Sequence, residues 1–225
     1  MQRTAQPDGL IAALASGDKS TRLKAALAIG SNPEPDLLET LVERCAVESD
    51  FYVRDMLTWA LTRLPAEITV PRLLRELHSE HAQGRSQALH TLSKIKDARA
   101  WPAITQALLR DSDDEVARSA WRAAVVLVPP GQEKELAREL ASQLGRGDAD
   151  VQLSLSRALI ALGEEAIGPI LREAMASQDA GVRAHAKATE RLLLNPESGS
   201  DRALREAKRI FVLGNAHQAG SAGEE

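Results

Sequence analysis

The chain has 225 residues, of which 44% are hydrophobic and 27% charged, which is enough material to bury one continuous core. Its formal net charge of −4 provides no overall positive field, so we expect neither direct nucleic-acid binding nor membrane association. The single cysteine, Cys45, excludes an intramolecular disulfide and a thiolate metal cluster, and we find no signal core or membrane-spanning run, so we expect a cytoplasmic protein.

A repeat with a period of 31 to 35 residues runs along the chain. Its anchor positions are Arg22, Arg54, Arg85, Ala117, Gln152 and Arg183. Four residues before the anchor, five of the six units carry an aspartate: Asp18, Asp50, Asp113, Asp148 and Asp179. The third unit departs from this pattern, with His81 and Gly84. We expect each aspartate to cap the helix that follows it, and each anchor arginine to pair with a neighbouring aspartate.

Every unit reads as a pair of helices. After each anchor, apolar residues recur at offsets of three, seven and ten, as at Leu57, Leu61 and Leu64, which places them on one helix face. Shorter apolar segments precede the anchors, at residues 10–14, 37–45, 70–77, 104–109, 136–144 and 167–175. We expect four prolines to stand in the first turn of these first helices, where a missing N–H is tolerated: Pro35, Pro71, Pro102 and Pro169.

The pattern divides the chain into four parts. We expect residues 1–7 to be a flexible N-terminus, residues 8–195 to form the stack of helix pairs, and residues 196–213 to hold a linker and a helix that caps the last pair. That last helix could instead dock on a partner. Residues 214–225 are expected to be a disordered tail.

The repeated motif, as in Asp50-Phe51-Tyr52-Val53-Arg54, resembles the HEAT-repeat family, especially its short phycobilisome-lyase-like repeats, over roughly residues 8–195. The resemblance implies an all-α, right-handed α-solenoid of about six HEAT-type helical hairpins, with the second helices lining the concave face. Such repeats serve many unrelated roles. Residues 44–61 also look like small bacterial HEAT-repeat proteins associated with MerR-type transcription regulators, which makes such a regulator a candidate partner.

A candidate binding surface follows from the fifth position after each anchor. Large or basic side chains occupy it in the four middle units, and apolar ones at both ends: Leu27, Trp59, His90, Arg122, Arg157 and Ala188. Neighbouring positions on the same solvent-facing stripe of these helices add Asp55 and Arg118. The candidate partner-binding residues are therefore Asp55, Trp59, His90, Arg118, Arg122 and Arg157. The stripe also includes Met56, Thr62, Ser86, Lys94, Ser154 and His185. This basic strip fits an acidic peptide or helix.

A plainer interpretation is that the arginines pair with acids such as Glu115 or Asp150 on a solvated face. We expect Trp121 to be packed between repeats and Trp101 to anchor a helix entry. Cys45 should be a buried, inert thiol. We expect His78 and His81 to be solvated side chains and not metal ligands. No phosphate loop, nucleophile elbow or zinc motif is present, so the sequence predicts no catalytic residue, metal or cofactor.

Three functions remain open on the sequence. The first is a monomeric, non-catalytic protein-interaction scaffold or regulatory adaptor that binds an acidic peptide or helix on its concave face. The second is a bilin lyase-like protein that holds a tetrapyrrole there. The third is a HEAT-like alkylpurine DNA glycosylase or DNA-binding protein. Such an enzyme has a basic and aromatic site, which would be imitated in this chain by Asp55, Trp59, Arg118, Arg122 and Arg157.

Overall fold

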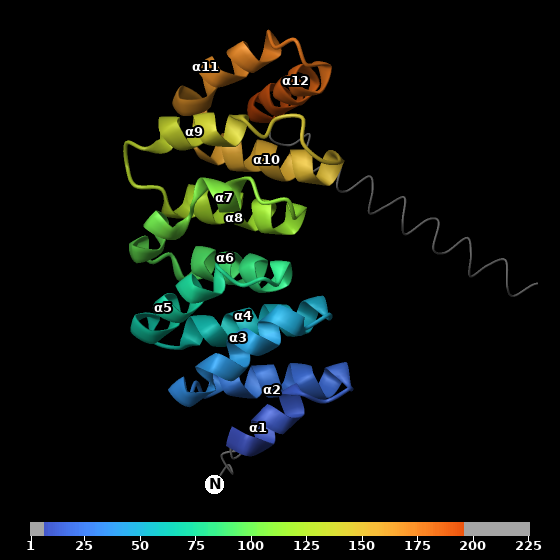
Figure 1. The fold of residues 1–225 in the computed structure, drawn as a ribbon, viewed down its shortest axis with the longest axis vertical. Coiled ribbons are helices and arrows are strands. Elements are labelled where there is room, and N and C mark those ends of the chain that lie inside the picture. Colours follow the sequence, from blue (N-terminus) through green and yellow to red (C-terminus); the bar gives the residue numbers. More distant parts are fainter. Residues whose placement is uncertain (1–6, 196–225) are drawn as a thin grey trace, which may run out of the picture.

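The computed structural model describes residues 7–195, which form twelve α-helices and two 3₁₀ helices and contain no strand (Figure 1). The predicted all-α stack of helix pairs is therefore confirmed. Residues 1–6, the expected helix within 196–213 and the expected tail at 214–225 lie outside the described residues.

The helices form six successive hairpins. The first three are α1 (Pro7–Leu14) with α2 (Lys19–Ser31), α3 (Leu38–Val47) with α4 (Phe51–Arg63), and α5 (Ala66–Glu76) with α6 (Ala82–Ile95). The last three are α7 (Gln106–Leu109) with α8 (Asp114–Leu127), α9 (Glu133–Ala141) with α10 (Ala149–Ala161), and α11 (Glu164–Met175) with α12 (Ala180–Leu194). Short 3₁₀ helices, η1 (Pro35–Leu37) and η2 (Ala98–Ala103), precede α3 and α7.

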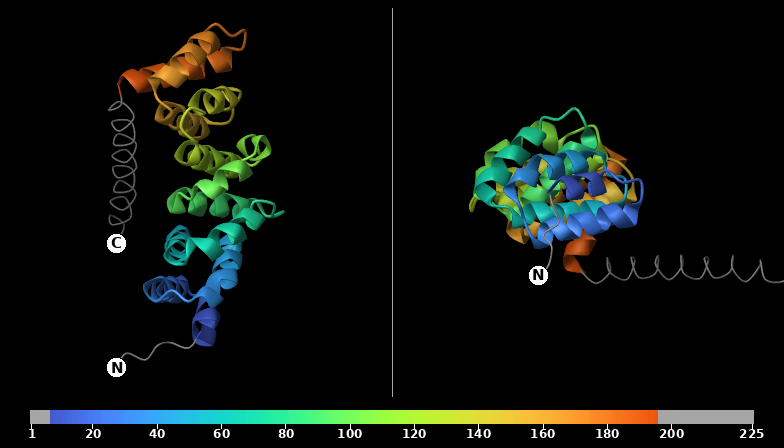
Figure 2. Two further views of the ribbon diagram at one scale, coloured as in Figure 1. Left: turned by 90° about the vertical axis from the view of Figure 1, so that its left-hand side faces the viewer. Right: turned by 90° about the horizontal axis from the view of Figure 1, so that it is seen from below.

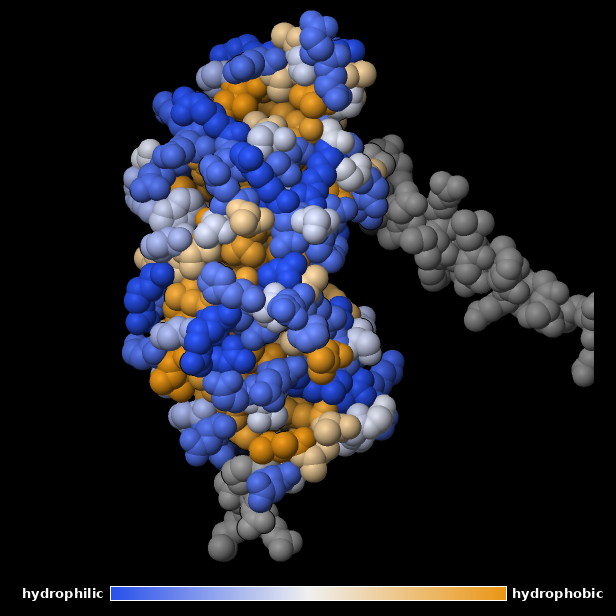
Figure 3. All heavy atoms as spheres, in the orientation of Figure 1, coloured by the Kyte–Doolittle hydropathy of each residue, from blue (hydrophilic) through white to orange (hydrophobic). Residues whose placement is uncertain are grey.

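The second helices of successive hairpins pack on one another, so α2, α4, α6, α8, α10 and α12 form one continuous layer. This layer lies on the inner side of a shallow curve, and the first helices form the outer layer (Figure 2). The apolar core runs between the two layers and includes the fully buried Ile29, Leu57, Leu89, Trp121 and Leu155. The outer face is largely hydrophilic, with apolar residues showing mainly between hairpins (Figure 3).

The predicted aspartate caps are confirmed in all five units that carry them. In α8, for example, the Asp113 side chain accepts hydrogen bonds from the backbone N–H groups of Glu115 and Val116, at 2.9 and 3.1 Å. A cap of this kind typically contributes about 1 kcal/mol because it satisfies N–H groups that have no partner within the helix. His81, which replaces the aspartate before α6, makes no side-chain capping bond.

The four anchor arginines share a contact that the sequence pattern did not predict. Each donates from Nη1 to the two backbone carbonyls five and six residues earlier, in the turn that joins the helices of its hairpin. Arg54, for example, lies 2.8 Å from the carbonyls of Glu48 and Ser49. Pairing with a neighbouring aspartate occurs only at Arg85, which also binds Asp111 of the next hairpin. The main task of the anchor is thus to close its own turn.

Arg22 also reaches the next hairpin, where it binds the fully buried carboxylate of Glu48 through Nε and Nη2, at 2.7 and 2.9 Å. Burial alone would raise the pKa of Glu48. Hydrogen bonds from Arg22, from the backbone N–H of Asp50 and from Arg44 outweigh burial and lower that pKa to about 2. The first two hairpins are therefore joined by a charged contact inside the stack.

In the fourth hairpin the anchor position holds Ala117, which has no side chain that could close the turn. Arg146, from the turn between α9 and α10, replaces it. Its Nη2 donates to the Asp111 carbonyl, its Nε lies 2.9 Å from Asp114 Oδ1, and its guanidinium lies over the Trp121 ring, 6.0 Å from the ring centroid. Trp121 is fully buried, as predicted, and its Nε1 donates to the Leu109 carbonyl at 2.8 Å.

The predicted place of the prolines is correct only for Pro35, the first residue of η1. The prediction is wrong for Pro71 and Pro169, because α5 and α11 begin earlier and contain these prolines in their interior. Each removes one i to i−4 backbone hydrogen bond there. Pro102 lies inside η2, so the first element of the fourth hairpin is split into η2 and α7, with the half-buried Trp101 packed against the core in η2.

Candidate functional site

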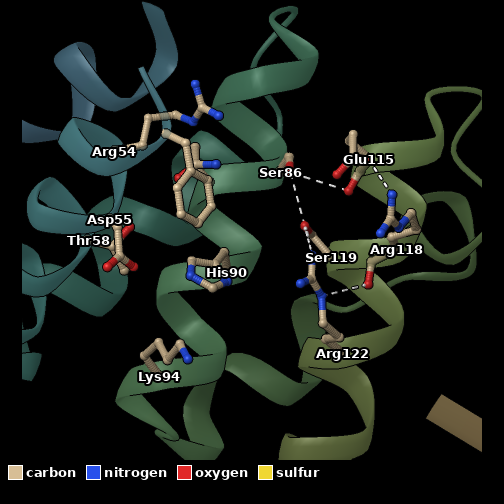
Figure 4. Close-up of a pocket in the computed structure, with 12 residues that line it drawn as sticks. Arg54, Asp55, Thr58, Ser86, His90, Lys94, Glu115, Arg118, Ser119 and Arg122 are labelled. Atoms are coloured by element: carbon tan, nitrogen blue, oxygen red, sulfur yellow. Dashed lines mark hydrogen bonds and ion pairs between the residues drawn. The ribbon is translucent and has the colours of Figure 1, made fainter. Parts of the chain in front are cut away.

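A cavity of about 520 Å³ opens on the inner layer between α4, α6 and α8 (Figure 4). We call it the central cavity. Polar and charged side chains dominate its lining, which consists of Phe51, Arg54, Asp55, Thr58, Ser86, Gln87, His90, Lys94, Glu115, Arg118, Ser119 and Arg122.

Arg118 and Arg122 form the α8 wall of the central cavity, four residues apart and therefore on one face of the helix. Arg118 binds Glu115 through Nη1 at 2.6 Å and the Ser154 hydroxyl through Nε at 3.0 Å. The predicted pairing of an arginine with Glu115 is thus present. Asp150, the other acid we considered, forms no ion pair within residues 7–195.

Arg122 makes no contact with a carboxylate of the described chain. Its Nε donates to the Arg118 carbonyl at 3.3 Å and its Nη2 to the Ser119 hydroxyl at 3.2 Å, both long bonds to neutral oxygens. Although Arg122 is exposed, loss of hydration beside the cavity walls, and then the positive charge of Arg118, lower its pKa, and the nearby Glu115 opposes this effect. The guanidinium still carries its charge at neutral pH.

His90 and Lys94 form the α6 wall. The half-buried His90 has a lowered pKa because of burial first, and then because of the positive charges of Arg122 and Lys94. Asp55 opposes this effect. His90 is therefore mainly neutral at pH 7, and Lys94 has no ion-pair partner in the part of the chain that the structure describes.

The α4 wall is formed by Asp55 and Thr58. Asp55 is exposed and makes neither a hydrogen bond nor an ion pair with any described residue. The Thr58 hydroxyl is buried and has no partner there either. Ser86 and Ser119 lie between the walls, where their hydroxyls are 2.9 Å apart and join α6 to α8.

Four of the six residues predicted to bind a partner meet in the central cavity: Asp55, His90, Arg118 and Arg122. Trp59 does not line it. Its indole ring lies against Gly30 of α2, where an added Cβ would overlap the ring, and the residue is 36% exposed. Arg157 lies exposed on α10, outside the cavity and without a partner in the described chain. The basic and aromatic set required by the glycosylase alternative is therefore not brought together.

Sequence reasoning also misplaced His185 and missed some lining residues. His185 is buried rather than solvent-facing, because its Nδ1 accepts from the Gly145 N–H at 3.0 Å and its Nε2 lies 2.9 Å from the Gln152 carbonyl. Phe51, Thr58 and Ser119 line the cavity without having been predicted. Only Phe51 carried a signal, as an aromatic residue at a helix start where the other repeats have none.

No other chemistry stands out in the described residues. Cys45 is buried, as predicted, and burial raises the pKa of its thiol to about 12, so it is not a nucleophile at neutral pH. His78 and His81 are both exposed. Within residues 7–195 no group of three or more metal-ligating side chains converges, and no helix combines the length and apolarity needed to cross a bilayer.

Stacked helical hairpins with a continuous inner layer of second helices define the class of α-solenoid repeat proteins. The family model for HEAT repeats matches residues 7–83 and 45–125, which together span more than half of the chain. The chain therefore belongs to the HEAT-repeat family.

Among solved structures, the complex of CpcE and CpcF of phycocyanin lyase from Nostoc sp. PCC7120 is similar to this chain at 22% sequence identity. The alignment covers 81% of this chain and 74% of that chain, with a TM-score of 0.46. A likeness at this level concerns the fold and says nothing of activity. Comparison with curated proteins gave no match.

Proposed function

We propose that this protein is a non-catalytic adaptor that binds an acidic segment of a partner protein in the central cavity. HEAT repeats in general mediate protein interactions, and no observation on the described residues adds support to the lyase alternative. A MerR-type regulator is one partner that deserves testing. The monomeric state and the cellular location that we expect from the sequence stay predictions.

The observation that carries the proposal is the uncompensated positive charge of the cavity. Four cationic side chains and two carboxylates line it, although the whole chain has a net charge of −4. Glu115 already binds Arg118, and Arg54 donates to two backbone carbonyls. Asp55 forms no ion pair, and Arg122 and Lys94 have no carboxylate partner in the described chain. A carboxylate that enters between α6 and α8 would meet both cations in a partly desolvated place, where charge-assisted hydrogen bonds are strong.

The test uses a fluorescein-labelled, glutamate-rich peptide and its glutamine counterpart in an anisotropy titration. We expect the wild-type protein to bind the glutamate peptide, and Arg122→Glu to weaken that binding at least tenfold, because the substitution places like charge in the cavity. Arg63→Glu is the matched control, since Arg63 is exposed on α4, outside the cavity, and has no described partner. Arg157→Glu tells whether the surface extends to α10.

Circular dichroism melts establish that each variant is folded. Equal binding by wild type and Arg122→Glu would contradict the proposal. Equal loss in Arg122→Glu and Arg63→Glu would reduce the interaction to the general charge of the surface, which also contradicts it.

A further inference from the structure

An exposed apolar group lies at the start of α4. Phe51 and Tyr52, the first two residues of that helix, are 66% and 70% exposed, and their rings meet edge to face with centroids 5.6 Å apart. Val47, the last residue of α3, is 63% exposed. We call Phe51 and Tyr52 the aromatic lip. Large apolar side chains that gather in the open mark an interaction surface more often than single ones do.

The repeat itself does not require aromatic residues at these positions. The first two residues of the other second helices are small or polar: Lys19-Ser20, Ala82-Gln83, Asp114-Glu115, Ala149-Asp150 and Ala180-Gly181. Tyr52 is the only tyrosine of the chain, and Phe51 is one of its two phenylalanines. Since neither ring is buried, packing within the stack does not explain why they stand here.

The aromatic lip is continuous with the central cavity, because Phe51 belongs to both. The lip lies on the α4 side, whereas Arg122 and Lys94 lie on α8 and α6. Arg54 of α4 has no carboxylate partner in the described chain either, but its Nη1 already donates to two carbonyls of its own turn. Packed helices are about 8 to 10 Å apart, so α4 and α8 are about 16 to 20 Å apart across α6. Phe51 stands three residues before its anchor and Arg122 five residues after its own, which adds about 12 Å along the helix axes, so the two side chains start about 20 to 23 Å apart. An extended chain covers that distance with about six or seven residues.

We propose that the aromatic lip and the central cavity are one docking surface, which takes a partner segment with a bulky apolar side chain about six residues from a cluster of carboxylates. This inference rests on the proposed function and adds an apolar anchor to it. The carboxylates would meet Arg122 and Lys94 while the apolar side chain packs on Phe51 and Tyr52. Charge would guide the approach, and the aromatic contact would hold the segment in one register.

The experiment is a double-mutant cycle between protein and peptide. The parent probe is a fluorescein-labelled peptide with one leucine about six residues before three glutamates. A second probe has serine in place of the leucine, and a third has glutamines in place of the glutamates. The protein variants are the double substitution Phe51→Ser with Tyr52→Ser, and Val126→Ser as the control, because Val126 is exposed and apolar but lies on α8 outside the cavity.

We expect the double variant to bind the parent peptide about tenfold more weakly than wild type, and to bind the serine peptide as wild type does. Val126→Ser should match wild type with every probe. Unchanged binding of the parent peptide by the double variant would overturn the inference, as would an equal loss with both peptides. Self-association of wild type that the double variant loses would assign the lip to a second copy of the chain and overturn it as well.

The failure of this inference is distinct from the failure of the proposed function. If Arg122→Glu and the glutamine peptide both weaken binding while the lip variant does not, the acidic site stands and only the apolar anchor is wrong. If the parent peptide does not bind wild type at all, both are wrong.

Discussion

The hydroxyl of Thr58 is an exception among the buried polar side chains. Thr69, Thr91 and Thr189 are also buried on helices, and each donates its hydroxyl hydrogen to the backbone carbonyl four residues earlier. Thr58 has no partner within residues 7–195. Leaving a buried hydroxyl unpaired typically costs about 1 to 3 kcal/mol, so Thr58 lowers the stability of the folded protein at the cavity wall.

Thr58→Val therefore should increase the free energy of unfolding by about 1 kcal/mol, since valine has the same shape and no hydroxyl to desolvate. Urea denaturation followed by circular dichroism measures it. Thr69→Val is the matched control and should not stabilise, because its hydroxyl has a partner, the Pro65 carbonyl at 2.9 Å. A Thr58→Val variant that is less stable than wild type would show that the hydroxyl does have a role in the folded state.

At the scale of single residues, the sequence predicted what depends on spacing along one helix. The aspartate caps followed from their distance to the anchor, buried Trp121 from its place beside the fifth offset, and buried Cys45 from the apolar rhythm of its helix. The partners of the anchor arginines did not follow, because a backbone carbonyl in a turn leaves no trace in the residue pattern. His185 was misplaced for a related reason, since its partners Gly145 and Gln152 belong to the preceding hairpin.

At the scale of elements, the turns of the hairpins are closed in two different ways. An arginine of the same hairpin closes the turn in four units, and Gln152 makes a similar bond to the Gly147 carbonyl at 3.2 Å. In the fourth unit Arg146 reaches back from the next hairpin to the Asp111 carbonyl. Position 117 and Arg146 are therefore alternatives for one task.

Arg146→Ala should lower the free energy of unfolding by about 2 kcal/mol, since it removes a charge-assisted bond to Asp114, a bond to a turn carbonyl and the contact with Trp121. Ala117→Arg should restore part of this loss in the Arg146→Ala background. In the wild-type background the same substitution should destabilise, because two guanidinium groups would compete for one carbonyl. Thermal melts of the four proteins measure the coupling. An equal effect of Ala117→Arg in both backgrounds would contradict the exchange.

The six hairpins themselves could be predicted, because apolar periodicity and the aspartate caps fix where second helices begin. The first helices were less predictable. Pro71 and Pro169 suggested helix starts, whereas α5 and α11 tolerate these prolines in their interior. In the fourth hairpin, the first helix is divided into η2 and α7, and nothing in the sequence pattern predicted this division.

At the scale of the whole molecule, the stack places residues of three hairpins in one cavity. The sequence predicted His90 and Arg122 from the fifth position after the anchor, and Asp55 and Arg118 from neighbouring positions on the same stripe. The same offset misled for Trp59 and Arg157. Equal offsets put side chains on equivalent helix faces, but they do not tell which neighbour a side chain leans toward. Gly30, which makes room for the indole of Trp59, belongs to another hairpin.

The last hairpin is attached to the stack through a titratable group. His185 on α12 accepts from the Gly145 N–H through Nδ1, so its proton lies on Nε2, next to the Gln152 carbonyl and the Ser156 hydroxyl. Burial lowers the pKa of His185, and the Gln152 carbonyl opposes this only in part. The neutral ring is thus the form that the folded protein prefers, and protonation of Nδ1 would displace the Gly145 N–H.

We therefore expect the attachment of α12 to weaken in acid. The contribution of His185 is complete above its ordinary pKa of about 6.5 and is lost as the pH falls below that value toward the lowered pKa. Hydrogen exchange at about pH 7.5 and about pH 5.5, corrected for intrinsic rates, should show lost protection in α12 before the central helices. His90→Gln should retain this loss, because His90 also has a lowered pKa but lies in the central cavity. Equal protection of α12 at both values would contradict the prediction.

The reach of Arg146 into the preceding hairpin also limits how the array can be shortened or recombined. A repeat protein is often treated as a row of interchangeable modules, each cut at the loop between two units. A cut after Leu127 would leave the fourth module without the side chain that holds its turn, and with the Asp111 carbonyl and Trp121 stripped of their partner. The fourth and fifth hairpins therefore form one structural unit, and a deletion or exchange of modules should keep them together.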